Sequence, residues 1–369
     1  MTAPRSQILS SLTPALVTLL VTGGIVLIVL ILAGGDPLTL VRLGTRYSQG
    51  DPLGTEGYDG QFVYYIARDP RPSEVASLLD VPAYRYQRLL MPLLGRLLSL
   101  GNPSILPVVL LLIGVLSQAA GAWAVGELFA GWGISRWYAL VYGLWAGCLL
   151  AVITDLPEPL AYALTAGGLL ALRSGRSVLG WLLLGLALFA KEVTLLFVGA
   201  ALLEALIARR WKDVLGLSLV AVLPFLVFQA WLWQVFGQPG LGSGGAMSTP
   251  FEWIPFMGLL RIGGASLLYL AAMLVVFGPL IVLPTVWGAW KSLIFFFAGN
   301  RNMVVLSLFF NSLMIVFLPF STFRETGGLL RLACGLVLAL LLFAARYRQM
   351  RILNYSWIWM VLNVFLFKS

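Results

Sequence analysis

The sequence of 369 residues contains no histidine, only two cysteines and few charged residues. Histidine is the commonest general base and the commonest metal ligand, so any acid–base chemistry must use Asp, Glu, Lys, Tyr or Cys. The cysteines, Cys148 and Cys334, lie in apolar runs without metal-ligand spacing, and a disulfide framework is not expected. Charged residues make up 11% of the chain, whereas a soluble domain carries about a quarter. So few charges cannot cover the surface of a water-soluble domain.

Long apolar runs take the place of the missing charges. Hydrophobic residues account for 60% of the chain, and their runs are continuous rather than alternating with polar residues. Alternation is expected of a transmembrane β-barrel, whereas continuous runs of about 20 residues are typical of helices that cross a bilayer. We therefore predict an all-α fold, a polytopic transmembrane helical bundle of about 10–11 spans that forms one domain over residues 1–369.

The distribution of positive charge predicts how the chain is oriented. The net charge is +9, which in a soluble protein would suggest binding to nucleic acid. In a membrane protein, cytoplasmic loops are rich in Lys and Arg, so we predict no nucleic-acid partner. With a first span at residues 14–33 that leads outward, the residues placed inside are Arg136, Arg173, Arg176, Arg209, Arg210, Lys212, Lys291, Arg301, Arg346, Arg348 and Arg351.

Two long segments are predicted to lie outside. The segment at residues 236–256 is rich in Gly, Pro and Ser, and we predict that it is flexible. The first outer loop, residues 36–101, is predicted to contain interfacial amphipathic helices. Acidic residues collect in this first loop, which contains seven of them: Asp36, Asp51, Glu56, Asp59, Asp69, Glu74 and Asp80.

The stretch "GYDGQFVYYIARDP" begins at Gly57 and places unusual polar chemistry beside the first span. Asp59 precedes a glycine, where the backbone can turn tightly, and residues 61–68 then read as an aromatic interfacial helix. One interpretation is that Asp59 caps this helix. The other is that it acts as a general base in a cleft at the membrane surface, since no histidine is present for that role.

The stretch "YRYQRLLMPLLGRLLSLG" places Arg85, Arg88 and Arg96 on one face of a helix and leucines on the other. This pattern is typical of an amphipathic helix in the membrane interface, with Pro92 favouring a break or kink. The arginines would either anchor the helix to lipid headgroups or bind the phosphate of one specific lipid. The pattern is compatible with both interpretations.

Two further pairs of charged residues lie near or within apolar runs. Asp155 and Glu158, in "ITDLPEPL", are suited to a divalent cation or sugar hydroxyls, and equally to turn and cap roles. Lys191 and Glu192 interrupt an apolar run that has basic residues at both ends. Because two charges in the middle of one straight helix are unfavourable, we predict two short helices that meet at this pair in a wet cavity. The pair is a functional candidate or an internal ion pair that fixes helix packing.

The segment "TFRETGGLLR" supplies Arg324, Glu325 and Arg331 at another outer edge. Arg324 and Arg331 lie seven residues apart, which places them on one face of a helix. Their guanidinium groups would complete a phosphate site or interact with lipid headgroups.

The combination of these motifs resembles the GT-C superfamily of integral-membrane glycosyltransferases, which use polyprenyl-phosphate sugars as donors. More narrowly, "GYDGQFVYYIARDP" with "YRYQRLLMPLLGRLL", "AKEVTLLF" and "FRETGGLLRL" resembles bacterial membrane proteins linked to the formation of cell-surface glycopolymers. The resemblance covers about residues 14–345 and depends on the whole set of motifs, because each one is short.

The resemblance implies an inverting transfer of a sugar to a glycan, lipid or protein acceptor, on the outer side of a bacterial inner membrane. It implies that Asp59 is the general base, and it leaves a divalent cation, Mg²⁺ or Mn²⁺, open as a cofactor. The residues expected to bind the donor phosphate are Arg85, Arg88, Lys191, Arg324 and Arg331. Those expected near the acceptor, the sugar or a metal are Tyr58, Gln61, Asp155, Glu158, Glu192 and Glu325.

Two other functions fit the same residues. A flippase or transporter of a lipid-linked sugar would use the arginines without a base, but such proteins often consist of two related halves, and the sequence shows no internal repeat. A non-catalytic membrane scaffold subunit would not need acidic residues and arginines gathered on the outer side.

Overall fold

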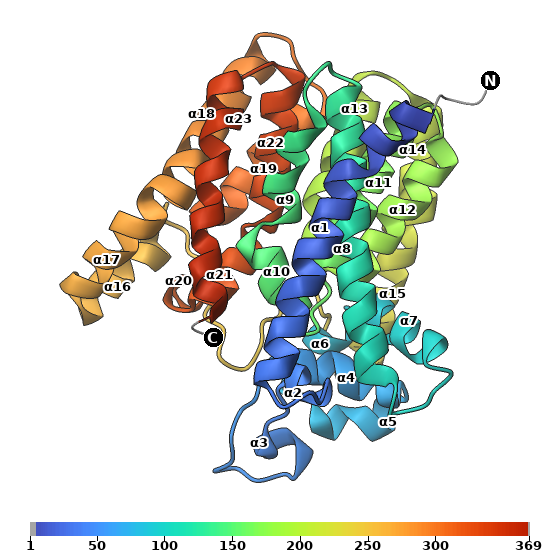
Figure 1. Ribbon diagram of the computed structural model, residues 1–369, viewed down its shortest axis with the longest axis vertical. Helices are drawn as coiled ribbons and strands as arrows, with labels where there is room; N and C mark the ends of the chain where they lie inside the picture. Colours follow the sequence, from blue (N-terminus) through green and yellow to red (C-terminus); the bar gives the residue numbers. More distant parts are fainter. Residues whose placement is uncertain (1–4, 368–369) are drawn as a thin grey trace.

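The computed structural model describes residues 5–367, and that range is built of helices without any strand. Long helices run side by side along the molecule, and short helices gather at one end (Figure 1). The prediction of an all-α bundle is confirmed. Five helices are long and apolar enough to cross a membrane, whereas the larger count of 10–11 spans stays a prediction. The five are Ser11–Leu32, Leu106–Ala130, Trp211–Phe236, Leu267–Phe297 and Thr326–Arg346.

The first helix, α1 (Arg5–Leu32), leads into the first loop, residues 36–101, which forms the lower end of the molecule in Figure 1. Its helices are α2 (Leu38–Val41), α3 (Thr45–Ser48), α4 (Gly60–Arg68), α5 (Pro72–Val75), α6 (Pro82–Tyr86) and α7 (Leu90–Leu98). The predicted interfacial position of α4 is wrong, because every residue from Gly60 to Ala67 is buried. This helix packs inside the loop against its neighbours and not on lipid.

The single amphipathic helix predicted for the arginine-rich stretch is also wrong. The chain forms α6 and then α7, with Arg88 in the turn between them. Pro92 lies in the first turn of α7, where a missing N–H interrupts no intrahelical hydrogen bond. Arg96 donates to the carbonyl oxygens of Ala67 and Arg68 at 3.4 and 2.5 Å, and so attaches α7 to α4. Arg96 therefore has a packing role within the first loop.

The middle of the chain confirms the predicted break at Lys191. This residue has an extended backbone, with φ −156° and ψ 122°, between two short helices. Residues 139–152 form two short helices and not one, because the first ends at Gly143 and the next begins at Ala146. The helices here are α8 (Leu106–Ala130), α9 (Ala139–Gly143), α10 (Ala146–Val152), α11 (Glu158–Arg173), α12 (Ser177–Ala190), α13 (Leu195–Ile207), α14 (Trp211–Gly216) and α15 (Leu223–Phe236).

The last third of the chain places Lys291 within a helix and not in a loop. The last α-helix begins at Met350 and is followed by a 3₁₀ helix, Trp357–Phe367. The helices here are α16 (Met257–Ala265), α17 (Leu267–Phe277), α18 (Leu283–Phe297), α19 (Met303–Val316), α20 (Phe320–Arg324), α21 (Thr326–Leu332), α22 (Cys334–Arg346) and α23 (Met350–Ser356).

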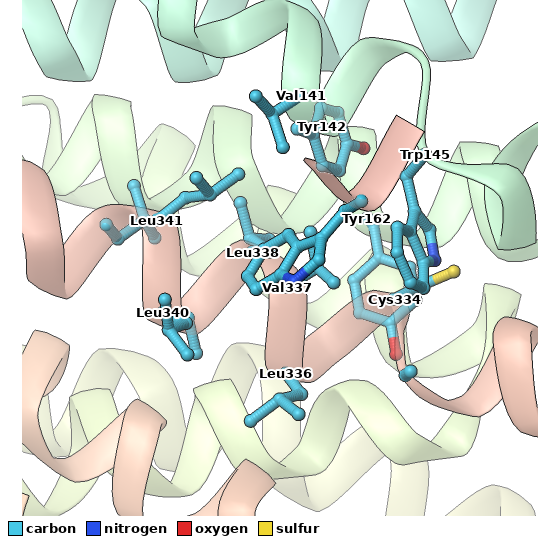
Figure 2. Packing of buried hydrophobic residues seen from close by; sticks show 14 of the residues in the cluster. Val141, Tyr142, Trp145, Tyr162, Cys334, Leu336, Val337, Leu338, Leu340 and Leu341 are labelled. Carbon is cyan, nitrogen blue, oxygen red and sulfur yellow. The ribbon is translucent and has the colours of Figure 1, made fainter. Parts of the chain in front are cut away.

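The centre of the bundle is the segment of α21 and α22. In this span 94% of the most apolar window is buried inside the protein, compared with 17% for α1, which therefore lies mostly exposed on the outside of the bundle. Figure 2 shows residues of α22 packed against Tyr142, Trp145 and Tyr162. The sulfur atoms of Cys148 and Cys334 lie 3.5 Å apart in this core, and both thiols are free. Their proximity was not evident from the sequence.

Helix α10 contacts this central segment so closely that only glycine fits at one position. A Cβ atom on Gly147 would clash with the carbonyl oxygen of Leu330, which also accepts a hydrogen bond from the Trp145 indole at 3.0 Å. Because both clashing groups belong to helical backbone, neither can move aside cheaply. The contact fixes the height of the central helix relative to α10.

We expect Gly147→Ala to destabilise the protein by about 1–3 kcal/mol, because the extra methyl group forces two packed backbones apart. Gly199→Ala in α13 is the matched control, since a Cβ atom there meets nothing within 4 Å and alanine favours a helix. Thermal unfolding in detergent, followed by circular dichroism, measures both. An unchanged Tm for Gly147→Ala would contradict the close approach of α10 and the central segment.

Candidate functional site

Asp59 lies at the N-cap position of α4, directly before Gly60, but its side chain makes no capping hydrogen bond. Its two carboxylate oxygens instead lie 3.0 Å from Arg85 Nη1 and 3.0 Å from Arg331 Nη1. The helix-cap interpretation is therefore wrong. Gly60 allows this arrangement, because a Cβ atom at that position would clash with the carbonyl oxygen of Thr154. The close approach places Asp59 beside the turn that leads into α11.

Arg85 connects Asp59 to a second carboxylate in the first loop. Its Nε and Nη2 donate to Asp80 at 2.7 and 2.8 Å, and its guanidinium carbon lies 4.3 Å from the centre of the Phe62 ring. Such a two-point contact holds the planar group in one orientation. Only one edge of Arg85 therefore remains directed at Asp59.

Arg331, on the central segment, is the point where several charged groups meet. Besides Asp59, it lies 4.0 Å from Glu158 and 3.8 Å from Glu325, and it stacks 5.1 Å from the centre of the Tyr58 ring. Its Nε is buried without an acceptor among residues 5–367. The guanidinium group is therefore not fully occupied by its neighbours.

Two buried ion pairs lie behind these contacts. Lys191 donates to Glu158 at 2.7 Å, with 4% and 1% of the two side chains exposed. Arg88 donates twice to Glu192, at 2.6 and 2.9 Å, and once to the hydroxyl of Tyr84 at 2.7 Å. The break in the helix at Lys191 directs the side chains of both Lys191 and Glu192 into the site.

We define the ion cluster as eight side chains from four distant parts of the chain. Its four carboxylates are balanced by four cationic groups, as expected for charges removed from water. Asp59 has 26% of its side chain exposed, whereas the other members have 11% or less, so Asp59 is the accessible point of the cluster. The members are Asp59, Asp80, Arg85, Arg88, Glu158, Lys191, Glu192 and Arg331.

The environment of Asp59 sets its proton affinity. Burial alone would raise the pKa of Asp59, but the positive charges of Arg85 and Arg331 outweigh it and hold the pKa well below the usual 3.8. Burial opposes ionisation of Asp80 in the same way, and the hydrogen bonds and charge of Arg85 lower its pKa overall. Both carboxylates are therefore ionised at neutral pH.

Asp155 lies near the cluster but does not join it. Its backbone is in the left-handed region, with φ 51°, its side chain is buried, and neither carboxylate oxygen has a partner within residues 5–367. Burial raises the pKa of Asp155 well above its usual value. Asp155 and Glu158 thus do not act as a matched pair. Across the described range, no group of three or more Asp, Glu or Cys side chains is placed to hold a metal ion.

The remaining predicted residues have separate positions. Gln61 is buried and hydrogen-bonded to the backbone of Gly44 and Glu56, at 3.0 and 2.6 Å. Both ends of its amide are therefore occupied within the first loop and do not point towards an acceptor substrate. Arg324 is exposed and stacks on Phe320, outside the cluster. Tyr58 and Glu325 do reach the site, and the tyrosine hydroxyl donates to the glutamate at 3.2 Å.

Two contributions to the site were not predicted from the sequence. Asp80 was counted only among the loop acids, although its spacing of five residues from Arg85 was a visible signal. The segment at residues 236–256 was predicted to be flexible, yet the N–H of Ala246 donates to Asp80 at 3.1 Å. A Cβ atom on Gly245 would lie 2.9 Å from Arg85 Nη2. This glycine-rich segment therefore lies directly against the ion cluster.

We expect Lys191→Met to destabilise the protein by about 3–5 kcal/mol, because it leaves Glu158 buried with its nearest counter-charge removed. The double variant Lys191→Met with Glu158→Gln should recover much of that loss, since no buried charge is then orphaned. Arg46→Gln, in an exposed pair with Glu56, is the control and should cost less than about 1 kcal/mol. If Lys191→Met unfolds at the same temperature as Arg46→Gln, the buried pair does not form.

A second prediction concerns pH. Because the pKa of Asp59 is lower in the folded state than its usual 3.8, the stability that it contributes is present above about pH 4. That contribution is lost as the pH falls further, through the lower folded-state pKa. The difference in Tm between wild type and Asp59→Asn should therefore be constant from pH 7 to about pH 4 and shrink below it. Asp51→Asn, at an exposed aspartate of the same loop, is the control, and a difference that persists undiminished at low pH would contradict the pairing of Asp59.

Comparison with known proteins identifies no relative that would indicate the role of this site. No protein-family model, no curated protein and no solved structure matches the chain. The resemblance to GT-C glycosyltransferases accordingly stays a prediction.

Proposed function

We propose that this protein is a membrane glycosyltransferase that moves a sugar from a polyprenyl-phosphate donor to a hydroxyl acceptor, with inversion, at the outer face of a bacterial inner membrane. The observation that carries the proposal is the position of Asp59. It is the accessible carboxylate of a buried ion cluster, held between two arginines that are suited to bind phosphate. Arg331 lies in one of the helices long and apolar enough to cross a membrane, which suits a donor whose tail stays in lipid.

In the proposed reaction the acceptor hydroxyl oxygen attacks the anomeric carbon of the donor sugar. The bond from that carbon to the phosphate oxygen breaks, polyprenyl phosphate leaves, and the hydroxyl proton passes to Asp59. Negative charge grows on the leaving phosphate, and fixed cationic groups lower the barrier where such charge develops. Arg85 and Arg331 are the groups in position to do this.

The arginines must exchange partners when the donor binds. In the free protein they hold Asp59 ionised and weakly basic, because their charges lower the pKa of Asp59. A phosphate that attracts Arg85 and Arg331 weakens their hold on Asp59, so its proton affinity rises. The unpartnered Nε of Arg331 is the donor that requires the least rearrangement. Donor binding would thereby prepare the base.

Lys191, Glu158, Arg88 and Glu192 act through their neighbours in this proposal. Lys191 and Glu158 are almost fully buried and bonded to each other, so they hold Arg331 in place and do not touch substrate. Arg88 and Glu192 similarly stabilise the end of the first loop against the break between α12 and α13. In this proposal these four are positioning residues. They replace the direct contacts with donor and acceptor that were expected of them from the sequence.

The test is transfer from a panel of radiolabelled polyprenyl-phosphate sugars in native membranes. Asp59→Asn should lower transfer about 10²- to 10⁴-fold, the usual contribution of a general base, while donor binding is retained. Asp51→Asn, in the same loop, should transfer at the wild-type rate.

The outcomes separate the competing functions. Equal transfer by wild type and Asp59→Asn would remove Asp59 from the chemistry. An absence of transfer with every donor, together with retained binding of polyprenyl phosphate, would instead indicate a flippase. If the Arg331→Gln variant loses donor binding while the separate Asp59→Asn variant retains it, the donor phosphate binds at the central segment.

A further inference from the structure

A cavity of about 240 Å³ lies at the opposite end of the molecule from the ion cluster, where the basic loops are. It is bounded by the ends of α8, α11, α13, α14 and α22 and by the start of α19, and the labels of α13 and α14 mark this end in Figure 1. Apolar side chains such as Ala201, Leu217 and Met303 contribute to its wall, together with three arginines. The proposed glycosyl transfer makes no use of this cavity.

The arginines in the cavity differ in how their charge is balanced. Arg210 lies 3.5 Å from Glu204 and 3.3 Å from Asp213, both of which also line the cavity. Arg173 and Arg346 have no carboxylate within 4.0 Å in the described range, and their positive charges act against each other. Both arginines are exposed, so solvent screens part of this repulsion, and an anion in the cavity would reduce it further.

Trp132 supplies a second sign of a missing partner. Its ring lies under Arg173, whose guanidinium carbon is 4.8 Å from the ring centre, and Arg173 also donates to the carbonyl oxygen of Gly131. The indole Nε1 of Trp132 is buried without an acceptor within residues 5–367. A buried donor without a partner is unfavourable, and an acceptor in the adjoining cavity would satisfy it.

We propose that this cavity binds a phosphate group, with Arg173 and Arg346 as its charge partners and the Trp132 indole as a hydrogen-bond donor. Guanidinium groups match phosphate oxygens in geometry and charge. The phosphate can come from the headgroup of an anionic phospholipid or from a soluble phosphate. The apolar part of the wall favours the phospholipid, because basic pockets between membrane helices are known to bind such headgroups.

Purified full-length protein in detergent provides the test. Phosphatidylglycerol binding is measured by native mass spectrometry, and inorganic phosphate binding by the shift in Tm. The double variant Arg173→Gln with Arg346→Gln should bind at least about tenfold more weakly, because two charge-assisted contacts are lost. Arg301→Gln is the matched control, since Arg301 stacks on Phe296 beyond the cavity wall and should leave binding unchanged.

The two probes distinguish the sources of the phosphate. Phosphatidylglycerol binding that the double variant weakens supports a lipid headgroup, and the same result with inorganic phosphate alone supports a soluble ligand. If the double variant weakens the binding of neither probe, the proposal is overturned, and it is also overturned if the wild type binds neither probe. If the double variant does not fold, Trp132→Phe decides, because it keeps the ring and removes only the indole N–H: weaker binding supports the site, and unchanged binding refutes it.

Discussion

The carboxylate of Asp59, shared between Arg85 and Arg331, is the interaction on which the rest of the site depends. It joins the first loop to the most buried helical segment of the bundle, across 272 positions of the chain. Arg85 then orients Asp80, and Asp80 holds the glycine-rich segment through Ala246. Removing the central carboxylate would leave two buried guanidinium groups facing each other. Three parts of the structure are therefore positioned by a single side chain.

Burying so many charges in an apolar bundle is stable only if they are balanced and well directed. Four carboxylates face four cationic groups in the ion cluster, and most of the contacts are between 2.6 and 3.0 Å. The interruption of the helix at Lys191 is part of this balance. A continuous helix through Lys191 and Glu192 would point the two side chains in directions about 100° apart. The extended residue instead lets one reach Glu158 and the other reach Arg88.

The sequence indicated the kinds of residues in the site better than their contacts. The helical class and the break at Lys191 follow from local rules about apolar runs and charge, so both could be predicted. The pairing of Asp59 with Arg331 could not, because nothing local relates two positions so far apart, and the capping rule then suggested the wrong role. The prediction of a single helix from Arg85 to Arg96 was wrong for a related reason. Its arginines match carboxylates in other parts of the fold, which a helical pattern alone does not reveal.

The two phosphate sites proposed for this protein differ in their electrostatics. At Asp59 the arginines are already paired, so a phosphate must displace a carboxylate, and its binding is linked to the proton affinity of that carboxylate. At the cavity near Arg173 and Arg346 no carboxylate has to be displaced from those two residues, and an anion relieves an existing repulsion. Under these proposals, occupancy of the first site would be coupled to chemistry, whereas occupancy of the second would stabilise the folded state. The same residue type serves both ends of the bundle, and the presence or absence of a carboxylate partner determines what each arginine does.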